Sequence, residues 1–513
     1  MLYTISPADM KRIEAAAMAE RLVSGEALME RAAAHVAAAV ARCLSEKPGR
    51  VLAVCGPGNN GGDGLAAVRL LFEQGVINRA SVLLMEGDLS ADNRRELKRL
   101  AERHSDISME QTPEAVSDWG FPPDTACIVD ALFGTGLTRE IEGETKALCL
   151  RMTEAQARGI PVIAVDIPSG LNGETGQVMG AAVRATETVS FHRPKNGLYL
   201  GLGPNYTGTV VVGDIGIPAA WDGAKGYSIA EVSDMPRFFP PRLPVTHKGS
   251  YGRVLVIAGS LGMAGAAALN ATAALRTGAG LVTIACPDRI VDALQQLCPC
   301  ATCVPLPEDA GEAWAALAPA LALADAVSMG CGMGTGGWAS ALVRQTACWI
   351  AKEGKPAVID ADALNILARE ETPQAFFTPA QIFTPHPAEA ARLLKRSISA
   401  IISDVAAAAR DLGKRYGASV VLKGAVSLLL SGAQAGLNVI GTPALAKGGS
   451  GDALAGVLAA LLAGQACGTT TLSSFETLQA GSALHGMAAI RAASEFGERG
   501  VMASDVCSYL GRN

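Results

Sequence analysis

A glycine-rich segment late in the chain has the composition of a phosphoryl-transfer loop. Residues 447–454 read Lys-Gly-Gly-Ser-Gly-Asp-Ala-Leu and open an apolar run typical of a buried helix. Glycines let several backbone amides point to one place, and the first turn of a helix adds its own amides and positive dipole end. Such an anion hole stabilises a phosphoryl group in transfer. Asp452 can accept a proton from an attacking hydroxyl there, although an Asp at this position can also simply cap the helix.

Three further motifs place charged side chains directly after short apolar runs: Asp360 with Asp362, His386 with Glu389, and Lys423 with Gly424. Parallel strands end at a common edge of the sheet, and ligands of α/β proteins bind at that edge. Taken singly, His386 is more typical of a turn residue bonded to the backbone, and Lys423 of a solvated strand end. Their shared position after strands favours a functional site.

The first half of the chain carries a second constellation of polar residues. Residues 56–64 read Gly-Pro-Gly-Asn-Asn-Gly-Gly-Asp-Gly, and this density of glycine is typical of a backbone that approaches a ligand closely. Asp130 and Asp166 each follow an apolar run, so we expect them to lie beside Asp63 at one sheet edge. Carboxylates gathered there repel one another unless a cation or a donor-rich ligand is present. The alternative is that Asp130 and Asp166 only cap the turns that follow them.

Two similar openings indicate the elements that position these residues. Residues 50–56 and 253–259 each form an apolar run that ends in glycine and precedes an alanine-rich stretch, which is the strand–turn–helix start of a parallel sheet. A chain of 513 residues exceeds one hydrophobic core. Prolines concentrate between residues 216 and 250, so we predict two α/β domains, residues 1–222 and 223–513.

Composition excludes several classes of protein. The net charge is −6 and no basic run exceeds two residues, so no nucleic-acid partner is expected. The apolar stretches are too short to cross a membrane, and charged residues near the N-terminus exclude a signal peptide, so we expect a cytoplasmic protein. The twelve cysteines do not form a disulfide framework; Cys298, Cys300 and Cys303 lack a fourth metal ligand nearby, so reduced thiols are favoured. Alanine-rich helices favour a homo-oligomer.

Residues 59–64, 133–136 and 165–170 resemble the motifs of the NAD(P)H-hydrate epimerase family, as does Leu28-Met29-Glu30. The resemblance implies a Rossmann-like three-layer domain that interconverts the R and S forms of the hydrated cofactors NADHX and NADPHX. It implies potassium ligands at Asn60, Asp130 and Ser169, and oxygen ligands suit such a cation. It also implies these hydrate contacts: Asn59, Asn60, Gly61, Gly62, Asp63, Gly134, Thr135, Gly136, Leu137, Thr138, Arg139, Glu140 and Asp166. We expect Asp166 to move the proton and Asp63 mainly to fix the substrate.

Residues 247–252, 274–280, 360–365, 384–387 and 448–452 resemble the ribokinase-like superfamily and, within it, the NAD(P)H-hydrate dehydratase family. The resemblance implies a C-terminal ribokinase-like α/β/α domain that dehydrates the S hydrate with ADP and releases AMP and phosphate. Asp452 would be the catalytic base, and magnesium would screen the phosphates. The implied hydrate contacts are Ala266, Gly332, His386 and Asp452. The implied contacts of the adenine nucleotide are Lys423, Gly424, Ala425, Val426, Ser427 and Gly451.

Three residues depart from the pattern common in these families. Cys331 and Met333 stand where Pro and Leu are more frequent, and Thr442 stands where Asn is common. These changes reshape a pocket without removing a group needed for the chemistry. The preference for ADP over ATP follows from the fused relatives and not from these residues.

We therefore predict a bifunctional repair enzyme that epimerises and then dehydrates the hydrates. The alternative is a ribokinase-type small-molecule kinase fused to a non-catalytic Rossmann-like interaction module. Retention of Asp63, Asp130 and Asp166, together with the His386 motif, favours the repair enzyme.

Overall fold

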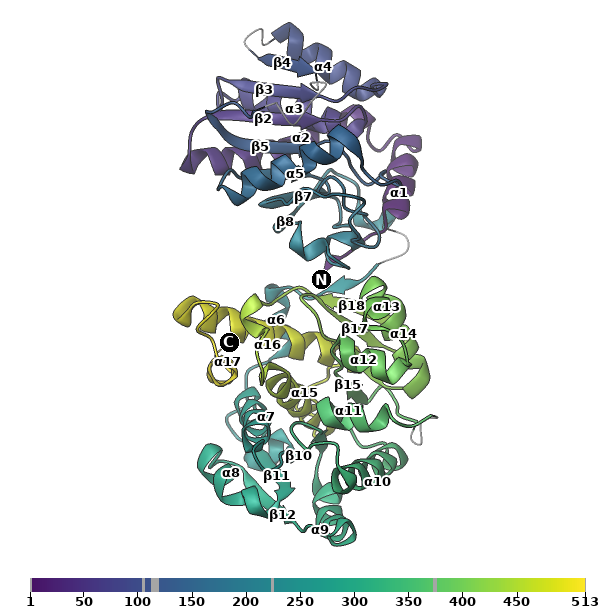
Figure 1. Cartoon of the computed structure of the whole chain (residues 1–513), viewed down its shortest axis with the longest axis vertical. Coiled ribbons are helices and arrows are strands. Elements are labelled where there is room, and N and C mark those ends of the chain that lie inside the picture. The colour runs from purple at the N-terminus through teal and green to yellow at the C-terminus, as the bar shows by residue number, and fades with distance from the viewer. Residues whose placement is uncertain (1, 104–106, 112–119, 223–225, 372–375, 513) are drawn as a thin grey trace. The chain divides into compact units, whose positions relative to one another are not determined.

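The chain forms two compact units, Tyr3–Tyr227 and Ser228–Asn513, the latter joined by Met1–Leu2 (Figure 1). The computed structural model describes residues 2–103, 107–111, 120–222, 226–371 and 376–512. Both units are α/β, as predicted, and their division falls between residues 227 and 228, within the proline-rich segment. Among the described helices, none combines the length and the apolar character that a bilayer crossing requires.

The sheet of Tyr3–Tyr227 has, within the described residues, the strand order β4-β3-β2-β5-β6-β7-β8, and its neighbours pair in parallel. The strands are β2 (Arg50–Cys55), β3 (Ala80–Leu84), β4 (Ser108–Gln111), β5 (Thr125–Ala131), β6 (Val162–Val165), β7 (Glu187–Phe191) and β8 (Thr209–Gly213). From β2 the chain first adds strands on one side and then returns to add β5 on the other. The topology therefore reverses between β2 and β5, and ligands of doubly wound sheets bind at the carboxyl ends of such a pair.

Helices cover both faces of this sheet. They are α1 (Pro7–Ala19), α2 (Gly25–Glu46), α3 (Asn59–Glu73), α4 (Ala91–Arg103) and α5 (Gly143–Ala157). Side chains alternate along a strand, so Val51 and Ala53 join the core formed with α2 and α3, whereas Leu52 and Val54 join the core formed with α5. The result is a three-layer Rossmann-like domain, as predicted.

The sheet of the second unit has, in the part of the chain that the structure describes, the order β1-β9-β18-β17-β16-β15-β14-β13-β10-β11-β12. Its strands are β1 (Leu2–Tyr3), β9 (Ser228–Ile229), β10 (Arg253–Ile257), β11 (Leu281–Pro287), β12 (Thr302–Leu306), β13 (Ala326–Met329), β14 (Ala357–Ile359), β15 (Gln381–Phe383), β16 (Ser419–Leu422), β17 (Ser427–Ser431) and β18 (Gln434–Asn438). Strands β10 to β16 pair in parallel, and β17 is antiparallel to both its neighbours. The order reverses between β10 and β13, which predicts the second binding edge.

Helix α15 lies in the interior of this unit, and other helices pack around it. The helices of the unit are α6 (Met235–Phe238), α7 (Ala264–Thr277), α8 (Val291–Leu297), α9 (Ala310–Leu323), α10 (Gly337–Glu353), α11 (Ala361–Leu367), α12 (Pro387–Leu394), α13 (Ile398–Ser403), α14 (Val405–Tyr416), α15 (Ser450–Ala466), α16 (Ser474–Phe496) and α17 (Ala503–Tyr509). Helix α15 is apolar all round and is buried from Ala453 to Gly464 between α7 and α16. A helix without a polar face belongs in the middle of a large core.

The contact between α15 and α7 depends on a glycine. A Cβ added at Gly456 would lie 2.1 Å from the carbonyl oxygen of Asn270, so the two helices approach more closely than any side chain permits. We expect Gly456→Ala to lower the free energy of unfolding by about 1–3 kcal/mol, because the helices must separate. Gly265→Ala is the matched control in α7, since a Cβ there meets nothing within 4 Å. Denaturant unfolding of both variants measures the difference, and equal stabilities would refute the packing argument.

Candidate active sites

Strand ends in the first unit hold the acids predicted from the sequence. Asp63 lies in the opening turns of α3, Asp130 lies near the end of β5, and Asp166 follows β6 directly. These positions belong to the carboxyl ends of neighbouring strands. Asp166 has a φ of 65°, in the left-handed region that few residues other than glycine adopt. A backbone held in that region is often a sign that the side chain must point in a particular direction.

Asp166 is fixed by Lys195, a residue that the sequence analysis did not identify. Lys195 Nζ lies 2.5 Å from Asp166 Oδ1 and donates to the carbonyl oxygen of Phe191 at 3.0 Å. The amide of Phe191 and the hydroxyl of Ser190 donate to the same carboxylate oxygen, each at 3.2 Å. Only 1% of Lys195 is exposed. The available sequence signal was a lysine four residues after the end of a strand, which is too common to be informative.

Two further carboxyl groups interact electrostatically with this ion pair. Burial raises the pKa of Asp63 well above its usual range, and the negative charges of Asp166 and Glu14 raise it further. Burial also raises the pKa of Glu14, against the opposing effect of Lys195. Glu14 comes from α1, which the sequence analysis did not connect with the site. The site thus combines an ion-paired carboxylate with two carboxyl groups whose pKa is raised.

The glycine-rich turn before α3 serves packing as well as ligand approach. A Cβ at Gly56 would lie 1.9 Å from the carbonyl oxygen of Leu132, and one at Gly62 would lie 2.7 Å from the methyl carbon of Met29. A Cβ at Gly58 would meet nothing within 4 Å, so this glycine faces open space. Helix α3 begins after Gly58, and no side chain of the described residues caps it. Its first amides are therefore free to bind an anion.

Asp130 and Ser169 are in direct contact, and Asn60, in the first turn of α3, lies against the loop that follows β5. Ser169 Oγ donates to Asp130 Oδ1 at 2.5 Å, and the amide of Ser169 donates to Asp130 Oδ2 at 2.8 Å. Burial raises the pKa of Asp130 to about 6, although the hydrogen bonds from Ser169 oppose this. A Cβ on Gly134 would lie 3.2 Å from Asn60 Oδ1, and Asn60 Nδ2 finds no hydrogen-bond partner among the described residues. The remainder of the 134–140 loop is half-buried or exposed.

The second site lies at the carboxyl ends of β14, β15 and β16, next to the start of α15. Lys423 Nζ lies 2.9 Å from Asp360 Oδ1 and 4.0 Å from Glu389 Oε2. A Cβ added at Gly451 would lie 3.2 Å from Lys423 Nζ and 3.5 Å from Asp360 Oδ2, so the ammonium lies directly against the glycine loop. Asp362 accepts a hydrogen bond from the amide of Gly334 at 2.8 Å. The two acids therefore have separate tasks: Asp360 pairs with the lysine, and Asp362 fixes the 330–334 turn.

Asp452 does not cap α15. The cap position is Gly449, with a φ of 93°, and no side chain of the described residues bonds to the first-turn amides. Asp452 lies within the first turn, where burial raises its pKa to about 6, although a hydrogen bond from Cys331 opposes the increase. A carboxyl group with a pKa near neutrality is suited to general-base catalysis. The simple capping role considered from the sequence is excluded by the position of Gly449.

Cys331 connects Asp452 with the core of the unit. The thiol is 1% exposed, accepts a hydrogen bond from Asn270 Nδ2 at 3.3 Å and lies in hydrogen-bonding contact with Asp452. A cysteine at this position therefore gives the base a neighbour that proline cannot provide. In the same turn, Gly332 has a φ of 63°, and a Cβ there would lie 2.9 Å from Cβ of Ala266. Two of the residues predicted to contact the hydrate are thus adjacent.

His386 has the role that the sequence analysis regarded as the alternative. Its Nδ1 accepts hydrogen bonds from the amides of Ala388 at 3.1 Å and Glu389 at 3.4 Å, so His386 caps α12. Burial and the charge of Lys423 lower its pKa. Its Nε2 lies 3.4 Å from Glu389 Oε1, and 46% of the side chain is exposed. Capping fixes the ring and leaves part of it accessible to a ligand.

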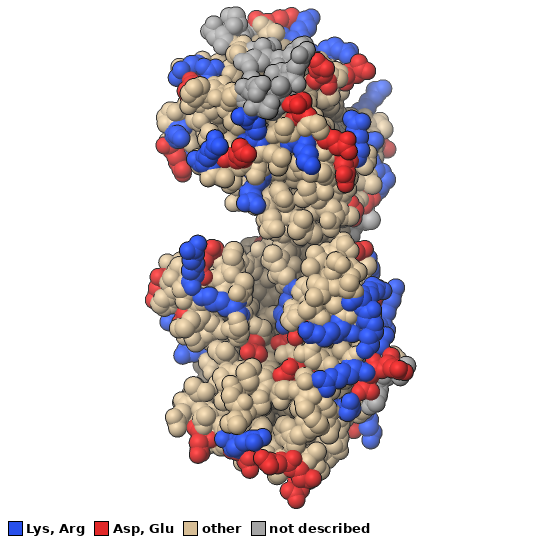
Figure 2. Space-filling view, in the orientation of Figure 1, with Lys and Arg blue, Asp and Glu red and all other residues tan. Residues whose placement is uncertain are grey.

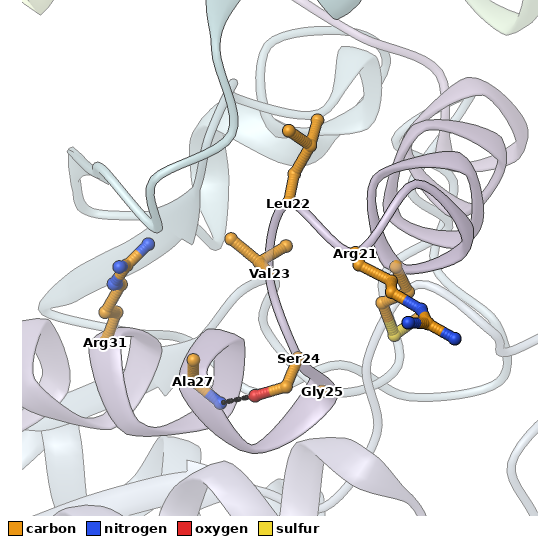
Figure 3. Close-up of a pocket in the computed structure, with 8 residues that line it drawn as sticks. Arg21, Leu22, Val23, Ser24, Gly25, Ala27 and Arg31 are labelled. Carbon is orange, nitrogen blue, oxygen red and sulfur yellow. Dashed lines mark hydrogen bonds between the residues drawn. The ribbon is translucent and has the colours of Figure 1, made fainter.

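Each unit contains a surface cavity. In the first unit, a cavity of about 510 Å³ lies between α1 and α2 (Figure 3). It is lined by Met18, Arg21, Leu22, Val23, Ser24, Gly25, Ala27 and Arg31, and none of these was predicted to bind a ligand. In the second unit, a cavity of about 750 Å³ lies between α7 and α17 and includes Gly448 of the glycine loop.

Lys and Arg side chains gather over α12–α14 of the second unit (Figure 2), and such a positive surface attracts polyphosphates.

The clustered cysteines differ in exposure. Cys298 is buried, Cys303 is half-buried and Cys300 is exposed, and all three are free thiols. Within the described ranges, no group of three or more His, Cys, Asp or Glu side chains is arranged to hold a metal ion.

Comparison with known proteins covers both units. The family model described as NAD(P)H-hydrate dehydratase matches residues 254–512, and the model described as the YjeF-related protein N-terminus matches residues 25–197. The bifunctional NAD(P)H-hydrate repair enzyme Nnr of Coxiella burnetii is 37% identical over 89% of this chain and 88% of its own length. The enzyme of the same name from Escherichia coli is 35% identical over 90% and 84%. The crystal structure of an ADP/ATP-dependent NAD(P)H-hydrate dehydratase from Bacillus subtilis, co-crystallized with ATP and Mg²⁺, is 26% identical, with a TM-score of 0.46 over 55% of this chain and 95% of that chain.

Proposed function

Because the chain belongs to the family of bifunctional NAD(P)H-hydrate repair enzymes, we propose that it restores NADH and NADPH from NADHX and NADPHX in two steps. Residues 1–222 interconvert the R and S hydrates, and residues 223–513 dehydrate the S form at the expense of ADP. The observation that carries this proposal is the presence of a built site in each unit, at the sheet edge where the topology reverses. We place the enzyme in the cytoplasm, with the nicotinamide cofactors.

Epimerisation requires a proton acceptor at the hydrate, and we assign this role to Asp166. Its carboxylate is aimed by the backbone of Phe191 and by Lys195. The amides at the start of α3, Asp63 and the 134–140 loop surround the same edge and would hold the substrate. The hydrate contacts proposed from the family motifs are therefore residues 59–63, residues 134–140 and Asp166.

A potassium ion fits the first unit. Asn60, Asp130 and Ser169 offer the oxygen ligands that a hard cation prefers. Asp130 is fully buried, and among the described residues it forms no salt bridge, so a cation would offset its charge. When bound, potassium would supply positive charge that keeps the loops after β5 and β6 together.

The dehydratase reaction follows from the position of Asp452 beside the glycine loop. Asp452 takes the proton of the hydroxyl at C6 of the hydrate, and the oxygen attacks the terminal phosphorus of ADP. The bond to the bridging oxygen breaks, and AMP leaves. Phosphate then leaves C6 and takes a proton from C5, which restores the double bond of the dihydropyridine. Phosphate is a much better leaving group than hydroxide, and this difference is the reason for consuming a nucleotide.

The surrounding residues would bind the reactants. Ala266, Gly332 and His386 would contact the hydrate, because they line the edge next to Asp452. Lys423 and Gly451 would hold the phosphates, and the 424–427 hairpin would hold the rest of the nucleotide. A magnesium ion, when present, would screen the phosphate charges.

We also propose that the chain forms a homo-oligomer. Two large apolar side chains that line the cavity between α7 and α17 are exposed: Leu297 at 56% and Met502 at 58%. Clustered apolar exposure of this kind is typical of a protein–protein contact. Light scattering of the purified chain gives the assembly mass, and a monomer would refute this part of the proposal.

Purified protein given an equilibrated mixture of NADHX epimers and ADP tests the function. We expect the near-ultraviolet absorbance of the dihydronicotinamide to return in two phases, because the S epimer is consumed first and the R epimer only as fast as it is converted. Absence of recovery with either ADP or ATP, combined with phosphorylation of a small-molecule alcohol, would favour the kinase alternative.

Cys331→Ala should move the pH dependence of the dehydratase. The hydrogen bond from the thiol lowers the pKa of Asp452, so its removal raises that pKa above about 6. The base must be ionised to act, and the rate should therefore begin to fall at a higher pH than in the wild type. Initial rates of the first phase between pH 5 and 8 measure the shift. Cys348→Ala, at an exposed thiol of α10, is the control and should leave the profile unchanged.

A further inference from the structure

A buried ammonium group lies at the centre of the first site. Lys195 is 1% exposed and forms a 2.5 Å ion pair with Asp166, which is itself 14% exposed. The same ammonium donates to the carbonyl oxygen of Phe191 at 3.0 Å and approaches Ser190 Oγ at 3.4 Å. Lysine is rarely buried unless it is paired, because desolvation disfavours its charged form. A buried lysine at a ligand-binding edge therefore calls for an explanation.

Carboxyl groups from three elements interact electrostatically in this site. Asp166 comes from the end of β6, Asp63 from α3 and Glu14 from α1. Asp63 is influenced by Asp166, Glu14, Asp92 and Glu96, and all four charges favour its protonated form. Glu14 is influenced by Lys195 and Asp166. Of these carboxyl groups, the one that the ammonium of Lys195 touches is Asp166.

We propose that Lys195 is a positioning residue of the epimerase, whose ammonium pairs with Asp166 and aims its carboxylate, so that Asp166 acts as the base and Asp63 as the acid. The site then offers a base and an acid at the same time. This inference rests on the proposed epimerase function and adds to it the division of roles between the two aspartates. From the sequence alone, Asp63 is expected mainly to fix the substrate.

Simultaneous acid and base catalysis suits the chemistry at C6. This carbon carries both a hydroxyl group and the ring nitrogen, so it is a hemiaminal carbon. Asp166 removes the hydroxyl proton, the carbon–oxygen bond becomes a carbonyl, and the bond from C6 to the ring nitrogen breaks while Asp63 gives the nitrogen a proton. Rotation of the open aldehyde presents its other face, and the same proton transfers in reverse close the ring. Atoms and electrons balance without an oxidant or reductant.

Loss of the positive charge should change the base and not only the fold. Without Lys195, Asp166 is a half-buried carboxyl group beside Asp63 and Glu14, and both burial and like charges favour its protonated form. A protonated Asp166 cannot accept the hydroxyl proton at neutral pH. Raising the pH should ionise it again and restore part of the activity.

The two-phase recovery assay on the full chain separates the possible outcomes. For Lys195→Met, we expect the second phase, which reports epimerisation, to slow by about 10²–10⁴-fold at neutral pH and to recover as the pH is raised. The first phase, which reports the dehydratase, should be unchanged and serves as an internal control for the proposed function. Lys146→Met, at an exposed lysine of α5, is the matched control and should leave both phases unchanged.

Lys195→Arg distinguishes charge from packing. A guanidinium keeps the positive charge, so we expect the acid limb of the second phase to stay at its wild-type pH even where the larger group slows the reaction. The proposal is overturned by a second phase that is unaffected in Lys195→Met, or by a loss in that variant that no pH restores. Should Lys195→Met fail to fold, as judged by its thermal unfolding, Lys195→Arg decides alone, and an acid limb displaced in that variant overturns the proposal.

Discussion

Replacing Asp452 with Asn is expected to slow the return of dihydronicotinamide absorbance from the S hydrate by about 10²–10⁴-fold, which is the usual contribution of a general base. Asn has nearly the same shape and keeps a polar group in the first turn of α15. What it lacks is the ability to take the hydroxyl proton before phosphoryl transfer. The oxygen of the hydrate is then a poor nucleophile, and ADP is not consumed. The first phase of the recovery assay, followed together with AMP release, measures the effect.

The pKa of Asp452 also predicts the direction in which the dehydratase rate changes with pH. Burial raises the pKa of Asp452 to about 6, and the charge of Asp360 adds to the increase. Since only the ionised carboxylate accepts a proton, the wild-type rate should fall as the pH drops through about 6 and level off above it. The residual rate of Asp452→Asn should show no such limb. A limb that persisted unchanged in the variant would mean that another group is the base.

Asp292→Asn is the matched control for this experiment. Asp292 also lies in the first turn of a helix, α8, and its side chain is exposed. Loss of its charge should cost each helix a similar small amount of dipole stabilisation, about 0.3–1 kcal/mol. Equal losses of activity in the two variants would show that the effect comes from the helix and not from a base.

The fold and the edges of the two sites could be predicted because they depend on local sequence. A short buried run followed by a glycine turn and a helix specifies a unit of parallel sheet, and the carboxyl end of such a strand is a fixed place. The acids at residues 63, 130 and 166 were found in this way. The same reasoning placed Asp360, Lys423 and Asp452 at the second edge, where the structure has them together.

Residues contributed from distant elements could not be predicted in this way. Lys195 reaches Asp166 across 29 positions of the chain, and Glu14 approaches the same carboxylate from α1. The sequence around each of these two residues is typical of a charged residue on the protein surface. Cys331 was noticed only as a departure from the family pattern, and its contact with Asp452 depends on how the 330–334 turn packs against α15.

Local sequence did not reveal how the glycine turn packs or which residue caps each helix. The glycines of residues 56–64 were interpreted as making room for a ligand, yet the missing side chains of Gly56 and Gly61 make room for the carbonyl oxygens of Leu132 and Gly56. Conversely, the helix-capping role was considered for Asp452 but belongs to Gly449, while His386 does cap its helix. Sequence identifies a helix start to within a few residues, and the identity of the capping residue lies inside that margin.

Replacing Asp166 with Asn should leave the R hydrate unconsumed. The variant is chosen because Asn tolerates the left-handed backbone, here at a φ of 65°, better than Ala does. The side chain still reaches Ser190 and Phe191, so the turn after β6 should keep its shape. The variant loses the base and leaves the ammonium of Lys195 without its partner. We expect the second phase of recovery to slow by about 10²–10⁴-fold, towards the rate of spontaneous epimerisation.

The first phase supplies the control, because the same molecules carry an intact dehydratase. We expect its amplitude and rate to match the wild type, so that recovery stops at the fraction of S hydrate present at the start. Supplying wild-type protein to the stalled reaction should then release the remaining absorbance, which shows that the R hydrate has accumulated and has not decayed. A second phase at the wild-type rate would remove Asp166 from the mechanism and, with it, the role proposed for Lys195. A stalled reaction with an unchanged first phase would assign the proton transfer to this carboxylate.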